Sequence, residues 1–114
     1  MSVVANFIGS LELPAYLLLS GTSVQTVYTA ENSTTTLAAF TLSNNTAGAI
    51  TCSVFHNDGS SEWLIWTGSV PANSSVTVTD NPVRLLNTER IRASGNTNVT
   101  VKLSLISQLA TRPA

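Results

Sequence analysis

The stretch VTVKLSLIS, which runs from Val99 to Ser107, alternates apolar and polar residues. Its odd-numbered positions up to Leu105 are all Val or Leu, and the even-numbered positions between them are Thr, Lys and Ser. Successive side chains of a β-strand point to opposite faces of a sheet. The alternation therefore predicts a strand with one face in a core and the other in water, which is typical of antiparallel sheets.

Similar short runs fill the chain from residue 24 onward and are separated by turn signals such as the NDG sequence at residues 57–59. The runs expected to form strands cover residues 24–29, 36–42, 50–56, 62–67, 75–79, 83–86, 89–94 and 99–107. In the second run, one face is expected to carry Thr36, Ala38, Phe40 and Leu42. This pattern predicts an all-β fold, an antiparallel two-sheet sandwich of jelly-roll or immunoglobulin-like type with seven or eight strands.

The first 23 residues lack this alternation, although they are largely apolar. They are predicted to form an extended N-terminal arm or docking segment, with a sandwich domain at 24–108 and a C-terminal tail at 109–114. A helical turn is compatible with the sequence from Tyr16 to Ser20. Because free apolar side chains are a liability, the arm must pack on its own domain or on a neighbouring subunit, and we favour the neighbour. The residues assigned to docking are Val3, Val4, Phe7, Ile8, Leu17 and Leu18.

The composition indicates a single domain that is neither a nucleic-acid-binding nor a membrane protein. Of the 114 residues only 10% are charged and the net charge is −1, against about 25% charged residues in an average domain. No apolar run approaches the roughly 20 residues that span a bilayer. The charges are divided, with five acids and no Lys or Arg in residues 1–83 and a net charge of +4 after them. The two halves can pair within one fold, which we favour, or across a subunit interface.

No catalytic, metal-binding or cofactor-binding constellation emerges from the residues, so no enzyme activity and no cofactor are expected. The single Cys52 is expected to be a buried thiol that behaves as a small hydrophobe. The single His56 lies four residues further along the same predicted strand, roughly 13 Å away, which is too far for a direct Cys–His pair. One histidine and one cysteine do not make a zinc site at the usual ligand spacings.

Trp63 and Trp66 are the residues with the strongest potential for recognition. They are three positions apart in a predicted strand and are therefore expected on opposite faces. Tryptophan is a favoured anchor in protein interfaces, and an exposed ring also stacks on sugars. An interface or ordinary packing is the favoured role, and a sugar platform remains the alternative.

The chain from Val27 to Ser107 resembles a group of small β-sandwich proteins found in the virions of tailed bacteriophages. The resemblance is carried by an ordered series of motifs, VYTAENSTT at 27–35, LSNNTAG at 42–48, VPANS at 70–74, and Leu85 followed by ERIRAS at 89–94. This chain has Ala30 where the group usually has Pro after Tyr-Thr, and Thr88-Glu89 where Gly-Asp is common. Both departures affect turns more than the fold.

The resemblance implies a non-enzymatic structural protein of a phage particle, with no catalytic residues to carry over. Its expected function is capsid decoration, as a cement protein that binds the phage major capsid protein or other virion proteins and stabilises the head. The protein is expected to form a homo-oligomer, with a trimer favoured. It is expected to be located in the virion, which is assembled in the host cytoplasm. The alternative is a fibre, neck or tail-associated adaptor, or a carbohydrate (receptor)-binding module.

Overall fold

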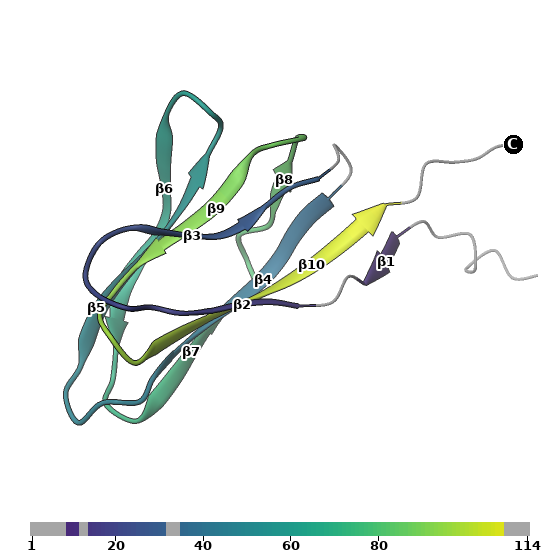
Figure 1. The fold of residues 1–114 in the computed structure, drawn as a ribbon. Helices are drawn as coiled ribbons and strands as arrows, with labels where there is room; N and C mark the ends of the chain where they lie inside the picture. Colours follow the sequence, from purple (N-terminus) through teal and green to yellow (C-terminus); the bar gives the residue numbers. More distant parts are fainter. Residues whose placement is uncertain (1–8, 12–13, 32–34, 109–114) are drawn as a thin grey trace, which may run out of the picture.

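The chain folds into two stacked antiparallel sheets in a computed structural model that describes residues 9–11, 14–31 and 35–108 (Figure 1). The predicted two-sheet sandwich is confirmed. The described residues form ten strands instead of the seven or eight expected. These strands are β1 (Gly9–Leu11), β2 (Ala15–Leu18), β3 (Gln25–Thr29), β4 (Thr35–Asn44), β5 (Ile50–Asn57), β6 (Glu62–Val70), β7 (Ser74–Val78), β8 (Val83–Leu85), β9 (Arg90–Ser94) and β10 (Val99–Gln108).

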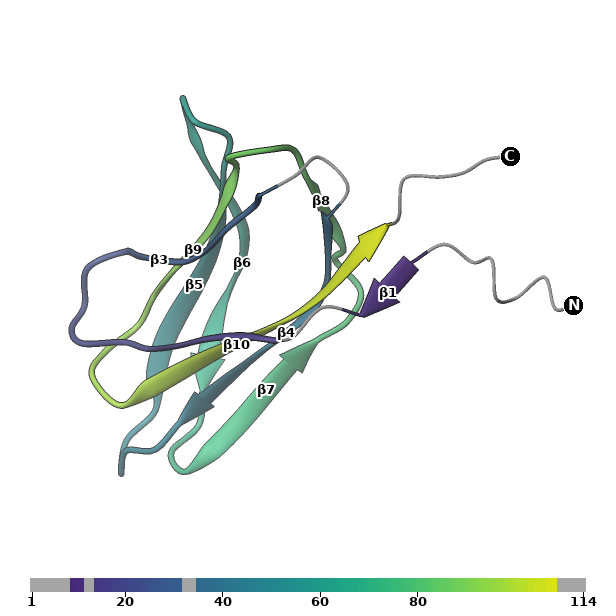
Figure 2. The ribbon, with the colours of Figure 1, turned by 45° about the vertical axis from the view of Figure 1, so that its right-hand side comes forward.

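The first sheet, here called the β4/β10 sheet, has β10 and β4 at its centre. β1 and β2 pair with different parts of β10 on one side, and β7 and β8 pair with different parts of β4 on the other. The second sheet, the β5/β9 sheet, has the order β3-β9-β5-β6. Figure 2 shows the two sheets after a turn that brings the side with the termini forward. β2 of the first sheet and β3 of the second, both labelled in Figure 1, contact each other at one side of the sandwich. No helix long and apolar enough to cross a membrane occurs in the described residues.

The core fills the space between the sheets with the apolar face of each strand. The alternation that begins at Val99 places that residue and every second residue to Leu105 in the core, as the sequence predicts. Phe40 on β4 packs edge-on against Trp66 on β6, with ring centroids 6.3 Å apart, and so joins the two sheets. Outward-facing hydroxyls pair across neighbouring strands, for example Thr41 with Thr77 at 2.9 Å.

The predicted face of β4 is wrong in its first half, because the strand contains a bulge. Leu105 on β10 lies opposite Leu37, while Ser104 lies opposite Ala39, so Ala38 is an extra residue without an opposite partner. An extra residue reverses which of the preceding side chains point into the core and which point outward. Thr36 therefore faces outward and Leu37 is fully buried.

The helical turn considered from Tyr16 to Ser20 is wrong, because this segment forms the strand β2. β2 runs antiparallel to β10 with Leu17 opposite Val101. The next residue, Leu19, is 1% exposed and belongs to the core, and its amide donates to the carbonyl of Val99 at 2.8 Å. Residues 15–19 thus belong to the sandwich, although the sequence groups them with the arm.

Candidate functional site

The strand β2 forms an apolar, uncharged edge of the β4/β10 sheet. Tyr16 and Leu18 point away from the core and are 61% and 60% exposed. In the part of the chain that the structure describes, β2 pairs only with β10, so its other edge has no strand partner. Lys102 is the cross-strand neighbour of Tyr16, and its Nζ lies 5.8 Å from the centroid of the Tyr16 ring. Edge strands usually carry charges or prolines that discourage pairing.

The structure divides the residues assigned to docking into three groups. Leu18 is exposed on β2. Leu17 points the other way and packs against the chain's own core, so it contributes to folding. The remaining four, Val3, Val4, Phe7 and Ile8, lie outside the described residues.

The two tryptophans lie on the same face of β6, and the prediction of opposite faces is wrong. Trp66 is opposite Val54 and Trp63 is opposite His56, and Ile65 is an extra residue where the register shifts. Val54 and His56 are two apart on β5 and share a face. The bulge at Ile65 therefore brings Trp63 to the face that Trp66 occupies. Trp66 is half-buried against Phe40 and supports the core, whereas Trp63 is 55% exposed near the end of the β5–β6 hairpin.

The turn of this hairpin is organised by the carboxylate of Asp58. Its Oδ1 accepts the backbone N–H groups of Ser60 at 2.9 Å and Ser61 at 2.8 Å, and its Oδ2 accepts the indole N–H of Trp63 at 3.0 Å. Gly59 adopts a φ of 97°, which a side chain would disfavour. The bond from Trp63, together with those from the two serine amides, lowers the pKa of Asp58 to about 2. Asp58 is therefore ionised at neutral pH.

A contact between the side chains of His56 and Glu89 lies close to this turn, and nothing in the sequence indicates it. His56 Nε2 is 2.9 Å from Glu89 Oε1, and the same oxygen accepts the backbone N–H of Leu86 at 3.0 Å. Glu89 follows Thr88, which has a φ of 73°. The two residues are 33 positions apart, so only the pairing of β5 with β9 brings them together.

The single cysteine lies apart from this pair. Cys52 is buried, as expected, and burial raises the pKa of its thiol. Its Sγ lies beside Gly95, where an added Cβ would be 3.0 Å from it. The described residues contain no group of three or more His, Cys, Asp or Glu side chains that could hold a metal ion.

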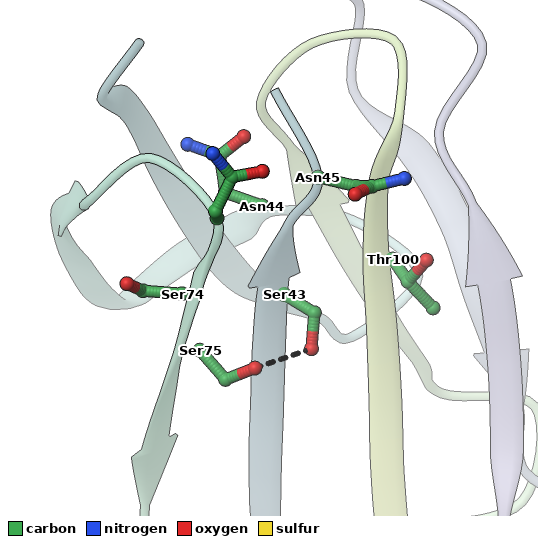
Figure 3. Close-up of a pocket in the computed structure, with 7 residues that line it drawn as sticks. Ser43, Asn44, Asn45, Ser74, Ser75 and Thr100 are labelled. Carbon is green, nitrogen blue, oxygen red and sulfur yellow. Dashed lines mark hydrogen bonds between the residues drawn. The ribbon is translucent and has the colours of Figure 1, made fainter. Parts of the chain in front are cut away.

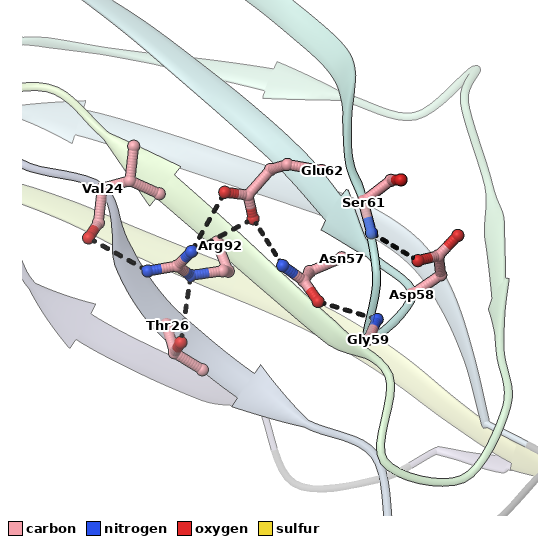
Figure 4. A network of polar contacts seen from close by, with 8 residues as sticks. All are labelled: Val24, Thr26, Asn57, Asp58, Gly59, Ser61, Glu62 and Arg92. Atoms are coloured by element: carbon pink, nitrogen blue, oxygen red, sulfur yellow. Dashed lines mark hydrogen bonds and ion pairs between the residues drawn. The ribbon is translucent and has the colours of Figure 1, made fainter.

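A polar network on the outer face of the β5/β9 sheet joins the two oppositely charged parts of the sequence (Figure 4). Arg92 Nη1 lies 3.0 Å from Glu62 Oε1, and its other nitrogens donate to the Thr26 hydroxyl and the Val24 carbonyl. Glu62 also accepts the side-chain amide of Asn57. For this pair of charges, the favoured interpretation of pairing within one chain is correct.

A shallow hollow of about 420 Å³ lies on the outer face of the β4/β10 sheet, at the end where β4 finishes and β7 begins (Figure 3). Its lining consists of Ser43, Asn44, Asn45, Asn73, Ser74, Ser75 and Thr100. The hydroxyls of Ser43 and Ser75 bond each other at 2.8 Å. Asn44, 2% exposed, donates to the Gly48 and Val70 carbonyls and accepts from the Thr46 amide, so it fastens two loops. The hollow is therefore mainly a structural junction.

The fold defines a small antiparallel β-sandwich, and comparison with solved structures agrees. No protein-family model matches the sequence, and neither does any curated protein sequence. A subunit of the disulfide-linked pili of Bacillus endospore appendages is similar over 96% of this chain and 98% of its own, with 18% identity and a TM-score of 0.55. A pentameric capsid protein from metagenomic phage sequences is aligned over 85% of this chain and 68% of its own, with 19% identity and a TM-score of 0.47. At these identities the pilus subunit establishes a shared fold and nothing more.

Proposed function

We propose that this chain is a non-enzymatic structural protein of a bacteriophage particle, a decoration or cement protein that binds major capsid subunits and stabilises the head. The observation that carries the proposal is the edge strand β2, which presents Tyr16 and Leu18 to solvent without a charge of its own. The series of motifs shared with virion β-sandwich proteins supports the same assignment. In this proposal the protein is a homo-oligomer, with a trimer expected.

Attachment through β2 would combine two kinds of interaction. The free edge of the strand can pair with a strand of the capsid subunit, as in other cases of sheet extension. Tyr16 and Leu18 would bury the roughly 60% of their surface that is now exposed. Full burial of such a side chain contributes about 1.5–3 kcal/mol, so these two contribute about 1–2 kcal/mol each. Many copies on a symmetric particle would multiply this effect.

The proposal is tested by measuring how tightly the purified protein binds heads of the phage that encodes it, prepared without their own copy of the protein. The double variant Tyr16→Ser with Leu18→Ser is expected to weaken binding by between about 30-fold and 1000-fold. Leu64→Ser is the matched control, because Leu64 is 56% exposed on the other sheet and should leave binding unchanged. Equal binding of the double variant and the wild type, with both folded, would contradict the proposal.

The alternative, an adaptor in a fibre, neck or tail, uses the same edge but a different partner. It predicts that the protein binds purified tails or necks and not heads. The same set of variants distinguishes the two locations when binding to heads and to tails is measured separately.

A further inference from the structure

Trp63 is a large aromatic side chain that the fold holds in an exposed position. The residue is 55% exposed, and its indole N–H donates a hydrogen bond to the Asp58 carboxylate at 3.0 Å. The hydrogen bond stops the ring from turning freely and leaves ring surface available to a ligand. A fixed aromatic surface suits a flat, partly apolar ligand, because little side-chain freedom is lost when the ligand binds.

The loop that fixes Trp63 is itself held in one conformation. Asp58 accepts two backbone amides of the turn, and Asn57 Oδ1 accepts the amide of Gly59 at 2.9 Å. Figure 4 shows two of these contacts, Gly59 with Asn57 and Ser61 with Asp58. The turn and the exposed face of Trp63 are therefore held in place before any ligand binds.

Polar groups lie beside Trp63 on the same side of the sheet. His56 is the cross-strand neighbour of Trp63, and side chains of such neighbours are roughly 4.5–5.5 Å apart at Cβ. His56 Nε2 contacts Glu89 Oε1, and the other carboxylate oxygen, Glu89 Oε2, takes no part in this contact. Asp58 Oδ2 is a second carboxylate oxygen, and it touches the edge of the ring. Both oxygens accept hydrogen bonds, as sugar hydroxyls require.

We propose that the end of the β5–β6 hairpin binds a neutral pyranose ring of a saccharide. The C–H face of the sugar would stack on the Trp63 indole, and its hydroxyls would donate to Asp58 and Glu89. The two carboxylates disfavour acidic sugars such as uronic acids, because like charges repel in a partly desolvated site. This site lies on the β5/β9 sheet and β2 lies in the other sheet, so the inference goes beyond the proposed attachment and is independent of it.

Saturation-transfer NMR with the methyl glycosides of glucose, galactose, mannose and N-acetylglucosamine tests the proposal on the intact chain. At least one of them is expected to bind with a Kd of about 1 mM, which is typical for a ligand of this size. Trp63→Ala should weaken that binding at least about tenfold, and Trp63→Phe should keep it within about threefold because a ring remains. Leu64→Ser, adjacent in sequence but on the opposite face, is the matched control and should change nothing. The methyl glycoside of glucuronic acid should bind at least about tenfold more weakly than the glucoside.

Absence of binding by all four neutral glycosides would overturn the proposal, as would binding that Trp63→Ala leaves unchanged. If Trp63→Ala does not fold, the indole N–H resonance of Trp63 in the wild-type chain decides instead. That resonance must shift during the titration, and a constant position would count against the site. If the indole N–H resonance of Trp63 shifts with capsids but with none of the sugars, the end of the β5–β6 hairpin contacts a protein and not a saccharide. Failure here leaves the Tyr16 and Leu18 experiment unaffected, so the two outcomes are distinguishable.

Discussion

Shortening Leu19 to alanine should destabilise the fold strongly, although the residue lies in a segment that the sequence assigns to an arm. The side chain is 1% exposed, and its Cδ1 lies close to Gly95, where an added Cβ would be 3.1 Å away. A buried Leu→Ala change removes methyl groups and leaves a cavity, at a total of about 2–5 kcal/mol. We expect the free energy of unfolding to fall by about 3 kcal/mol, because the amide of Leu19 remains bonded to Val99 and limits collapse of the structure around the cavity.

Leu18→Ala provides the matched control, one residue earlier on the same strand. Its side chain is 60% exposed, so the loss should stay below about 1 kcal/mol. Urea unfolding followed by tryptophan fluorescence measures both. For a domain of this size the slope is about 1–3 kcal/mol per molar urea, so Leu19→Ala should lower the midpoint by about 1–3 M. Equal midpoints for the two variants would refute the docking of β2 and Leu19 into the sandwich.

Three further changes test other parts of the structure. Asn44→Ala should reduce the free energy of unfolding by about 2 kcal/mol or more, because the buried Val70 carbonyl loses its donor; an unchanged urea midpoint would contradict this. Gly68→Ala should reduce it by about 1–3 kcal/mol, since the new Cβ would lie 2.8 Å from Trp66 Cζ2; a gain in thermal stability would show that the ring moves freely. Asp58 has a pKa of about 2 when folded and about 3.9 when unfolded. Its contribution to stability is thus complete above about pH 4 and is lost as the pH falls towards 2. In a Trp66→Phe background, Trp63 fluorescence should change with a midpoint near pH 2, and a midpoint near pH 4 would show that the bond to Asp58 is absent.

The strand β10 could be predicted because its local sequence pattern and the burial of its side chains agree. β10 alternates without interruption from Val99 to Leu105, and each apolar position is buried. Asp58 and Gly59 predict the turn of the β5–β6 hairpin because a turn depends on interactions within a few neighbouring residues. Here these are the hydrogen bonds that the Asp58 carboxylate accepts and the positive φ of Gly59.

Bulges were beyond prediction because they depend on the partner strand. Ala38 and Ile65 are ordinary strand residues, and nothing in their neighbours indicates an extra position. Each bulge changes which residues share a face of the sheet. The sequence pattern alone therefore predicts Thr36 in the core and places Trp63 and Trp66 on opposite faces of their strand, and both predictions are wrong. β2 was missed because its four residues are too few for an alternation to be recognised.

The candidate sites were predicted in part. Leu18 and Trp63 are exposed apolar side chains, and residue type alone suggested both. The contact between His56 and Glu89 joins elements 33 residues apart, so sequence spacing carried no information about it.

We propose that this sandwich acts by attachment to a phage particle through the β2 edge. Cryo-electron microscopy of the virion of the phage that encodes the chain tests it most directly. We expect density for the sandwich on the outside of the head, with Tyr16 and Leu18 against capsid subunits. A particle without this density, or a bound sandwich whose β2 edge faces solvent, would contradict the proposed attachment.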